Sequence, residues 1–412
     1  MDNVTHALAG MLVADATVEI LTPRGSVPDP AFRGRARWAS AIANNLPDLD
    51  YFYSGITPGR LGYLLHHRGY THTFGVGMAM GLASFLVLRW IWRRRALARR
   101  ELTTLLALSL VGPWIHVAMD FSNSYGVHPF WPFYSGWFYG DSIFITEPLY
   151  FLATVPALAL ASESRAGKLL LGAIVLFGVG LAWVTRFAGV GVASALTFGA
   201  LACAALTYFT RPRWRTWLAV ALSGCVTLVF FGASRVARAR VVESAAAPNR
   251  AHPIRVVDAS LTPAPSNPFC WSAMAVGTRG DRYELLVATV SVAPRLVRTE
   301  DCELEPTGHS LALALPSVNA TPSVRWDGEW SHPLSELREL WSTNCEARAY
   351  LRWARLPFWL RPTQHELFWG DLRYDRHAGL DFAEFVGTIP PTGCPRFVPP
   401  WIPPRHELLF EE

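Results

Sequence analysis

Histidines concentrate in the first third of the chain, where six of the twelve lie before position 129. The stretch HHRGYTH supplies His66, His67 and His72 just before a long apolar run, where a glycine turn can direct imidazoles inward. Further along, PWIHVAMD places His116 and Asp120 four residues apart, so both side chains share one face of a helix. Ionisable groups inside an apolar span are costly and usually face the bundle interior, which marks them as functional candidates.

Carboxylates accompany these histidines. In NNLPDLDY, Asp48 and Asp50 follow a proline that ends a short helix, so both can reach into a pocket. His6 lies on an apolar first helix, and Glu147 of TEPLY lies early in an apolar run where a lone charge is expensive. Each has a purely structural alternative: an exposed turn, a satisfied core histidine or an interhelical hydrogen bond. Asp141 is expected to cap the helix that follows it.

Imidazoles mixed with carboxylates suit a divalent metal, with zinc favoured and manganese or iron as alternatives. Ions held by shared carboxylates could activate water and clamp the oxygens of a transferring phosphoryl group. Arg68 could then hold a phosphate oxygen, or it could instead contact lipid head groups. His128 is as consistent with the membrane interface as with a site. The chain contains no HExxH, GxSxG or Walker motif, and no GxGxxG between a strand and a helix.

The elements that must position these residues are membrane helices. The chain has 51% hydrophobic and only 17% charged residues, which is too apolar for an ordinary soluble enzyme. Apolar stretches close to or above the length that crosses a bilayer occur at 73–92, 102–121, 142–161, 169–185, 187–209 and 216–234. The N-terminal apolar run begins with Asp2 and is interrupted by Asp15 and Glu19, so we do not expect a cleaved signal peptide.

Basic residues indicate the orientation. A Pro, Gly and Arg loop at 22–37 precedes WASAIANNL, which is half a span and predicts a short or re-entrant helix. If the first helix runs inward, the inner loops carry fifteen Lys and Arg residues, as the positive-inside rule requires. The outer segments then carry Arg60, Arg68, Arg186, Arg235, Arg238 and Arg240. This topology places the polar segments 44–50, 66–72 and 116–147 near the outer face. It also accounts for the net charge of +5 without nucleic acid.

A polar C-terminal third follows the linker ESAAAPNRAHP. It contains expected strands at YELLVATVSV (283–292) and HSLALALPSV (309–318). Four of the six cysteines lie here, namely Cys270, Cys302, Cys345 and Cys394. They permit three disulfide pairings and do not match a compact CxxC zinc site. We therefore expect a mainly α fold, with a polytopic helical membrane bundle over 1–240 and an extracytoplasmic, mostly β or α+β domain over 250–412.

The motifs THALAG, LPDLD, HHRGYTHT, HxxxD at 116–120 and the Glu-Pro of TEPLY occur in this order over residues 1–160. In this respect the chain resembles the YdjM-like, LexA-regulated family of membrane-bound metal-dependent hydrolases, which is distantly similar to zinc-dependent phospholipase C and P1 nuclease. The resemblance implies that the metal ligands, or their immediate neighbours, are His6, Asp48, Asp50, His67, His72, His116 and Asp120, with His66 and Glu147 as further candidates. Glu147 stands where the family tends to have Asp. The later HxxxE of the phospholipase pattern is absent, which argues against a full trinuclear zinc site.

The sequence thus predicts a hydrolase in the bacterial inner membrane, with its metal site at the outer face and its C-terminal domain in the periplasm. The expected substrate is a phosphoester of a lipid or an envelope precursor, and membrane lipid is the expected partner. Catalytic roles are expected for Arg68, Asp50 and Glu147. The alternatives are a metal transporter or sensor and an envelope scaffold whose metal is structural.

Overall fold

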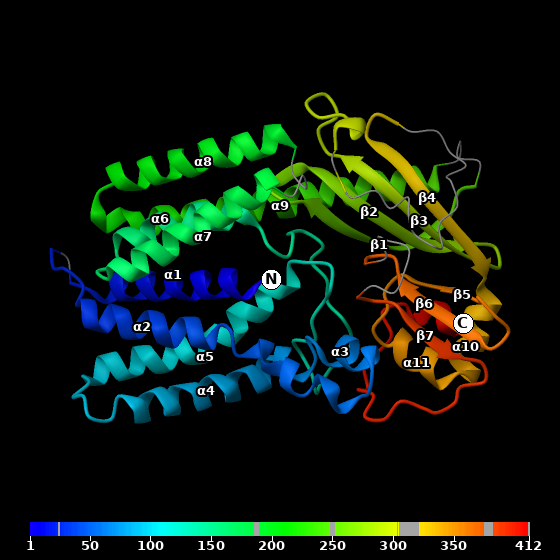
Figure 1. Ribbon diagram of the computed structural model, residues 1–412, viewed down its shortest axis with the longest axis horizontal. Coiled ribbons are helices and arrows are strands. Elements are labelled where there is room, and N and C mark those ends of the chain that lie inside the picture. Colours follow the sequence, from blue (N-terminus) through cyan, green and yellow to red (C-terminus); the bar gives the residue numbers. More distant parts are fainter. Residues whose placement is uncertain are drawn as a thin grey trace.

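The computed structural model describes residues 1–23, 25–184, 189–247, 252–302, 304, 321–374 and 382–410. In the described part, the N-terminal helices are α1 Asn3–Leu21, α2 Pro30–Ala43, α3 Arg60–His66, α4 Phe74–Ile91, α5 Arg99–Phe121, α6 Pro148–Leu160, α7 Arg165–Val184, α8 Val190–Phe209 and α9 Pro212–Ala246. Three 3-10 turns are interspersed: η1 Pro47–Phe52, η2 Ser54–Ile56 and η3 Tyr70–His72. Figure 1 shows the long helices side by side as a bundle, with the strands gathered beyond one end of it.

Six of these helices (α1, α4, α5, α7, α8 and α9) are long and apolar enough to cross a membrane, which confirms a multi-pass helical region. The predicted span 142–161 becomes a helix only from Pro148, because Glu147 caps it and the proline fixes its first turn. The prediction of a loop at 22–37 was also wrong over residues 30–37, which form the start of α2. Asp29 accepts hydrogen bonds from Ala31 and Phe32, so α2 begins at Pro30.

Acidic residues inside α1 are paired with arginines of α2. Arg37 Nη2 lies 2.5 Å from Asp15 Oδ2, and Arg33 Nη2 lies 3.4 Å from Glu19 Oε1. Burying a carboxylate in an apolar span is tolerable when a partner neutralises it. These pairs explain how α1 can carry two acids and still be a membrane helix.

Small residues bring α2, α4 and α5 into close contact. A Cβ atom at Gly81 of α4 would lie 2.2 Å from the Ser109 carbonyl oxygen of α5, and one at Gly112 would lie 2.7 Å from Ala43 Cβ of α2. The backbones can approach this closely only because these positions lack side chains. The close packing fixes the C-terminal turns of α5, where His116 and Asp120 lie.

Helix α9 continues far beyond the membrane. Its 35 residues correspond to about 52 Å at 1.5 Å per residue, well above the ~30 Å hydrocarbon core. The part beyond the bilayer packs on β1 and β2. There Arg238 binds Asp258 at 2.7 Å and Arg240 binds the Ser291 carbonyl. These arginines therefore serve the C-terminal domain rather than a membrane loop.

The C-terminal domain contains two antiparallel sheets among the described residues, which agrees with the expected fold class. The first has the order β1 Arg255–Ala264, β2 Asn267–Arg279, β3 Arg282–Ser291 and β4 Val324–Pro333. The second has the order β5 Pro357–Leu360, β6 Glu366–Asp371 and β7 Phe385–Thr388. Between and after them lie η4 Thr299–Asp301, α10 Leu334–Thr343, α11 Cys345–Leu351 and α12 His406–Leu409. The expected strand 283–292 forms as β3, whereas 309–318 lies outside the described residues. Disulfides join Cys270 to Cys302 and Cys345 to Cys394.

The domain packs directly on the segments that carry the candidate site. Leu64 and Leu65 of α3 and Tyr125, which follows α5, belong to the same hydrophobic core as Tyr283 and Trp353 of the C-terminal domain. Trp401 Nε1 donates to the Leu65 carbonyl at 2.8 Å. The bundle and the domain therefore share one core at one end of the membrane helices.

Candidate metal centre

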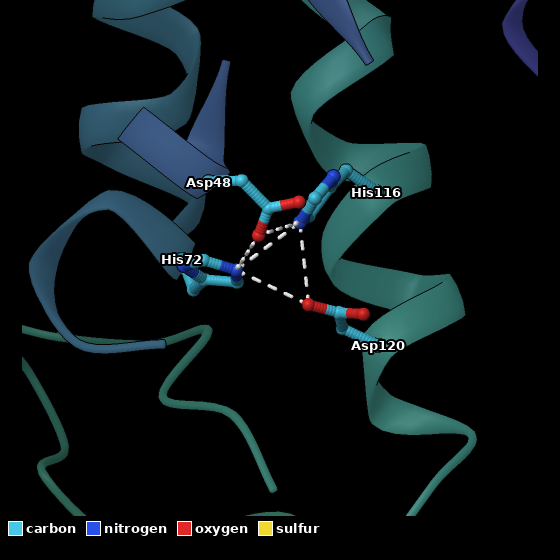
Figure 2. A group of neighbouring side chains, drawn as sticks. All are labelled: Asp48, His72, His116 and Asp120. Atoms are coloured by element: carbon cyan, nitrogen blue, oxygen red, sulfur yellow. Dashed lines mark hydrogen bonds and ion pairs between the residues drawn. The ribbon is translucent and has the colours of Figure 1, made fainter. Parts of the chain in front are cut away.

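Four side chains from three elements converge at the end of the bundle that faces the C-terminal domain. Asp48 comes from η1, His72 from η3, and His116 and Asp120 from the last turns of α5. Figure 2 shows the two imidazoles and the two carboxylates pointing toward one another. The i, i+4 spacing on α5 places His116 and Asp120 on one face, and Pro47 starts the tight turn that directs Asp48 inward.

The ligand atoms have the spacing that a four-coordinate ion requires. His72 Nε2 and His116 Nε2 lie 3.1 Å apart, and Asp120 Oδ2 lies 3.1 and 3.2 Å from them. Asp48 Oδ1 lies 3.6 and 3.5 Å from the same two nitrogens. A tetrahedral ion with bonds of about 2.0–2.1 Å separates its ligand atoms by roughly 3.3 Å. These five distances are close to this value, and all four ligand atoms lie within 4.8 Å of one another, so these residues could hold a metal ion.

The other ring nitrogens are held by acceptors. His116 Nδ1 donates to the Asn44 carbonyl at 2.7 Å, and His72 Nδ1 lies 3.4 Å from Asp50 Oδ2. A proton on each Nδ1 leaves each Nε2 with a lone pair, and both lone pairs face the common centre. Metal-binding histidines usually donate their second nitrogen to a carbonyl or a carboxylate in this way. In this tautomeric state the two nitrogens and the two carboxylates could hold a cation between them.

Electrostatics keep the groups outside the spans in their metal-binding forms. Burial lowers the pKa of His72 to about 3, against the opposing effect of Asp48, so the imidazole is neutral at neutral pH. Burial alone would raise the pKa of Asp48, but the adjacent His116 and His72 hold it well below its usual range. Burial would likewise raise the pKa of Asp50, yet His67, His72 and the Arg68 backbone lower it. Both carboxylates are therefore ionised.

Asp120 is the most connected member of the site. Its Oδ1 lies 3.3 Å from His6 Nε2 and also contacts the α-amino group of Met1. The ring of His6 stacks on that of His116, with centroids 3.7 Å apart. Arg68 Nε lies 3.1 Å from Asp120 Oδ2 and has no hydrogen bond of good geometry among the described residues. His6 and Arg68 thus flank the four ligands on two sides.

With this geometry established, the chain can be compared with known proteins. Residues 1–189 match the model of the YdjM inner membrane protein family. The resemblance inferred from the sequence motifs is thereby confirmed for this region. The chain is also 27% identical over 161 residues to the uncharacterized protein YfhP of Bacillus subtilis (strain 168), an alignment that covers 39% of this chain and 46% of that protein. The comparison with solved structures gave no match. The four residues that could hold a metal ion all fall within the YdjM region, and the C-terminal domain lies outside it.

Within the YdjM region, other predicted site residues take different places. His67 Nδ1 lies 3.2 Å from both oxygens of Asp50, so these two form a pair beside the four ligands. His66 Nε2 lies 2.9 Å from Thr57 Oγ1, which in turn donates to carbonyls of the C-terminal domain. The structure gives His66 a role in domain packing and does not bring it into the cluster.

Glu147 also lies apart from the four ligands. Its carboxylate caps α6 through the Leu149 backbone and accepts hydrogen bonds from the backbone and hydroxyl of Ser266, both at 3.0 Å. Burial raises its pKa to about 7. Glu147, rather than Asp141, is the helix cap. Asp141 instead accepts a bidentate bond from Arg355 at 2.7 and 2.8 Å.

His128 is buried between two tryptophans, Trp137 at 3.8 Å and Trp401 at 3.9 Å between ring centroids. Sequence reasoning missed three asparagines that support the site. Asn44 holds His116 through its carbonyl, Asn3 donates to Asp48 Oδ2 at 2.8 Å, and Asn123 accepts from Arg68 at 2.7 Å. The available signal was their position: Asn44 opens the motif NNLPDLD, Asn123 ends HVAMDFSN, and Asn3 lies two residues before THALAG.

Proposed function

We propose that this protein is a membrane-bound, metal-dependent hydrolase that cleaves a phosphoester. The observation that carries the proposal is the near-tetrahedral spacing of Asp48, His72, His116 and Asp120. Two imidazole nitrogens and two carboxylate oxygens suit zinc best, with manganese or iron next. A divalent ion held there would polarise a phosphoryl oxygen and lower the pKa of bound water.

The neighbouring residues supply positioning and charge. Asp50 orients two imidazoles, those of His72 and His67. Because His67 Nδ1 faces Asp50, its Nε2 is left for proton transfer, and its side chain reaches the surface. Arg68 places an unsatisfied Nε donor beside Asp120, where a guanidinium can bind a phosphate oxygen. Asp50 therefore has a positioning role, and Arg68 remains the candidate for binding phosphate. Glu147 lies apart from the four ligands, which does not support a catalytic role for it.

A structural ion is the second candidate. Four protein ligands are typical of closed structural zinc sites, whereas catalytic sites usually keep one position for water. The side chain of Asp48 is 13% exposed, whereas those of the other three ligands are fully buried. This partial exposure favours the catalytic function over the structural one. A transporter is less well supported, because the stretches 169–185, 187–209 and 216–234 contain no acidic residue or histidine that could continue an ion path.

The test is metal content and hydrolysis on the full chain purified in detergent. We expect stoichiometric zinc or manganese by mass spectrometry and hydrolysis of bis(p-nitrophenyl) phosphate that stops with chelator and returns with metal. The double variant His116→Ala, Asp120→Ala should lose both the metal and the activity. If metal removal melts the protein and no metal form hydrolyses the ester, the ion is structural. If folded wild type takes up no metal, the site is a packing network and the proposal fails.

We also propose that the C-terminal domain lies outside the cytoplasm. Two disulfides persist only in an oxidising compartment, and the arginine-rich turns that join α4 to α5 and α8 to α9 lie at the opposite end of the bundle (Figure 1). A cysteine introduced at the exposed Ser342 of α10 should react with a membrane-impermeant maleimide in intact spheroplasts. One introduced at the exposed Thr103 near the start of α5 should react only after lysis. The reverse pattern would refute this orientation.

A further inference from the structure

An aromatic cluster marks where the membrane ends on the outer side. Trp114 Nε1 of α5 donates to the Phe74 carbonyl at the start of α4, at 2.9 Å, and the rings of Phe74 and Phe130 pack 5.7 Å apart. Beside them Phe133 is 94% exposed. Aromatic residues gather at the boundary between hydrocarbon and head groups. From this level, the 18 residues of α4 extend about 27 Å to its arginine-rich end, close to the ~30 Å hydrocarbon thickness.

The metal-binding cluster lies just beyond this boundary. His116 and Asp120 follow Trp114 by two and six residues on the same helix, which runs toward the C-terminal domain (Figure 1). At 1.5 Å per residue they lie about 3 and 9 Å beyond the aromatic level. The head-group layer on each side of a bilayer is roughly 5–8 Å thick. The site is therefore at the depth of the lipid phosphates.

The accessible side of the site carries an uncovered apolar surface, which we call the apolar rim: Leu49, Tyr51, Phe52 and Ile56. Asp48 and Asp50 point inward from η1, while Phe52 and Tyr51 of the same turn are 87% and 61% exposed. Leu49 and Ile56 are also exposed, at 43% and 47%. The C-terminal domain packs on α3, and in the described part of the chain the four rim side chains stay exposed. Large apolar side chains grouped in this way, beside helices that end in lipid, indicate a membrane contact.

We propose that the apolar rim inserts into the outer leaflet and presents the Asp48 side of the site to the phosphoester of a lipid in that leaflet. The lipid phosphoester substrate rests on the proposed function, whereas the membrane insertion rests on the depth of the site and the exposure of the rim side chains. The bilayer is the occupant of this surface, because η1, which carries most of the rim, packs on η3, and η3 directly precedes α4, whose first residue Phe74 belongs to the aromatic cluster. A phosphoester on a soluble molecule would gain nothing from the rim.

The first test measures depth. Phe52→Cys is labelled with the fluorophore NBD in a Cys203→Ser, Cys225→Ser background, and the full chain is reconstituted into phosphatidylcholine and phosphatidylglycerol vesicles. Ser342→Cys on α10 is the matched exposed control. We expect quenching by a shallow doxyl-labelled lipid at position 52 to be at least threefold stronger than at 342, with the opposite order for iodide. Equal iodide quenching at the two positions, with no lipid quenching at 52, would overturn the insertion.

The second test separates the access of a lipid substrate to the site from the cleavage of its phosphoester bond. Dodecyl p-nitrophenyl phosphate in vesicles and methyl p-nitrophenyl phosphate in solution share the same bond to be cleaved. In Phe52→Ser and Ile56→Ser we expect about a tenfold loss on the vesicle substrate, mainly in KM, and no change on the soluble one. An equal loss on both, or no loss on either, would refute the role of the rim. If metal-loaded wild type hydrolyses neither ester, the hydrolase proposal fails, while the quenching result still decides insertion.

Discussion

The replacement Asp48→Asn tests the four-ligand site with the least damage to the fold. Asp48 is the most exposed ligand, and Asn retains an oxygen and can keep a hydrogen bond with Asn3. Loss of an outer partner of a metal ligand typically costs 10–100-fold in affinity, so loss of a ligand charge should cost at least about 100-fold. That factor corresponds to about 2.7 kcal/mol.

The loss is measurable as a change in stabilisation by metal. With free metal at 100 times the dissociation constant, binding stabilises the folded state by about 2.7 kcal/mol, and after a 100-fold loss of affinity the same concentration gives only about 0.4 kcal/mol. Without metal, Asp48→Asn removes a carboxylate whose ionised form His116 and His72 stabilise in the folded protein. Its apo form should therefore melt at or below the temperature of wild type. The decisive quantity is the rise in melting temperature on adding metal, which wild type should show and the variant should lose.

The assay is thermal unfolding in detergent with and without zinc, alongside metal content by mass spectrometry. Asp29→Asn is the control, because it neutralises a carboxylate that caps α2 at the other end of the bundle and keeps the cap. A folded Asp48→Asn protein that binds metal within threefold of wild type would refute the four-ligand arrangement. A similar loss in Asp29→Asn would show that the readout follows general stability.

Three further predictions concern a buried acid, a buried ion-pair network and a disulfide. Burial raises the folded pKa of Glu147 to about 7, from an unfolded value near 4.5. The contribution of Glu147 to stability is therefore complete below pH 4.5 and is lost as the pH rises through 7. The melting temperature should fall across this range in wild type but not in Glu147→Gln. Arg355→Met should cost about 3 kcal/mol in chemical denaturation, because it removes the buried cation that Asp141 and Asp258 share and leaves them only the more exposed Arg238 and Arg405. The exposed Arg361→Ala should cost less than about 1 kcal/mol, and equal costs would contradict the buried network. Replacing both Cys345 and Cys394 by Ser should lower stability by about 2–4 kcal/mol, and intact mass without reductant should show two fewer oxidised thiols than wild type.

Much of the fold could be predicted because its signals are local. Apolar runs predict membrane helices whatever their partners are, and the i, i+4 spacing of His116 and Asp120 already fixes them on one face. The turns around Asp48 and His72 are short, so these residues stay near the bundle end. For this reason the residues of the cluster were all among the candidates.

The partners that distinguish one polar residue from another are distant in the sequence. Glu147 resembled a site residue because a lone acid in an apolar run is costly, but its partner Ser266 lies 119 residues later. Asp141 resembled a cap until Arg355, 214 residues away, provided a bidentate partner. No local pattern encodes such contacts. Sequence therefore identified which groups are expensive to bury and could not tell which of them bind metal and which hold domains together.

The C-terminal domain also supports the site, so the two parts cannot be separated by truncation. Arg373 Nη1 donates to the Ser124 carbonyl at 2.7 Å, and within the same turn Asn123 accepts from Arg68, the arginine beside Asp120. Removing residues after 247 would free this turn and expose the core around Leu64. A truncated chain without metal would then report unfolding and would say nothing about the ligands. Point substitutions at the apolar rim and at Asp48 leave the domain contacts intact, so they can distinguish a hydrolytic site at the membrane surface from an ion that only holds the turns together.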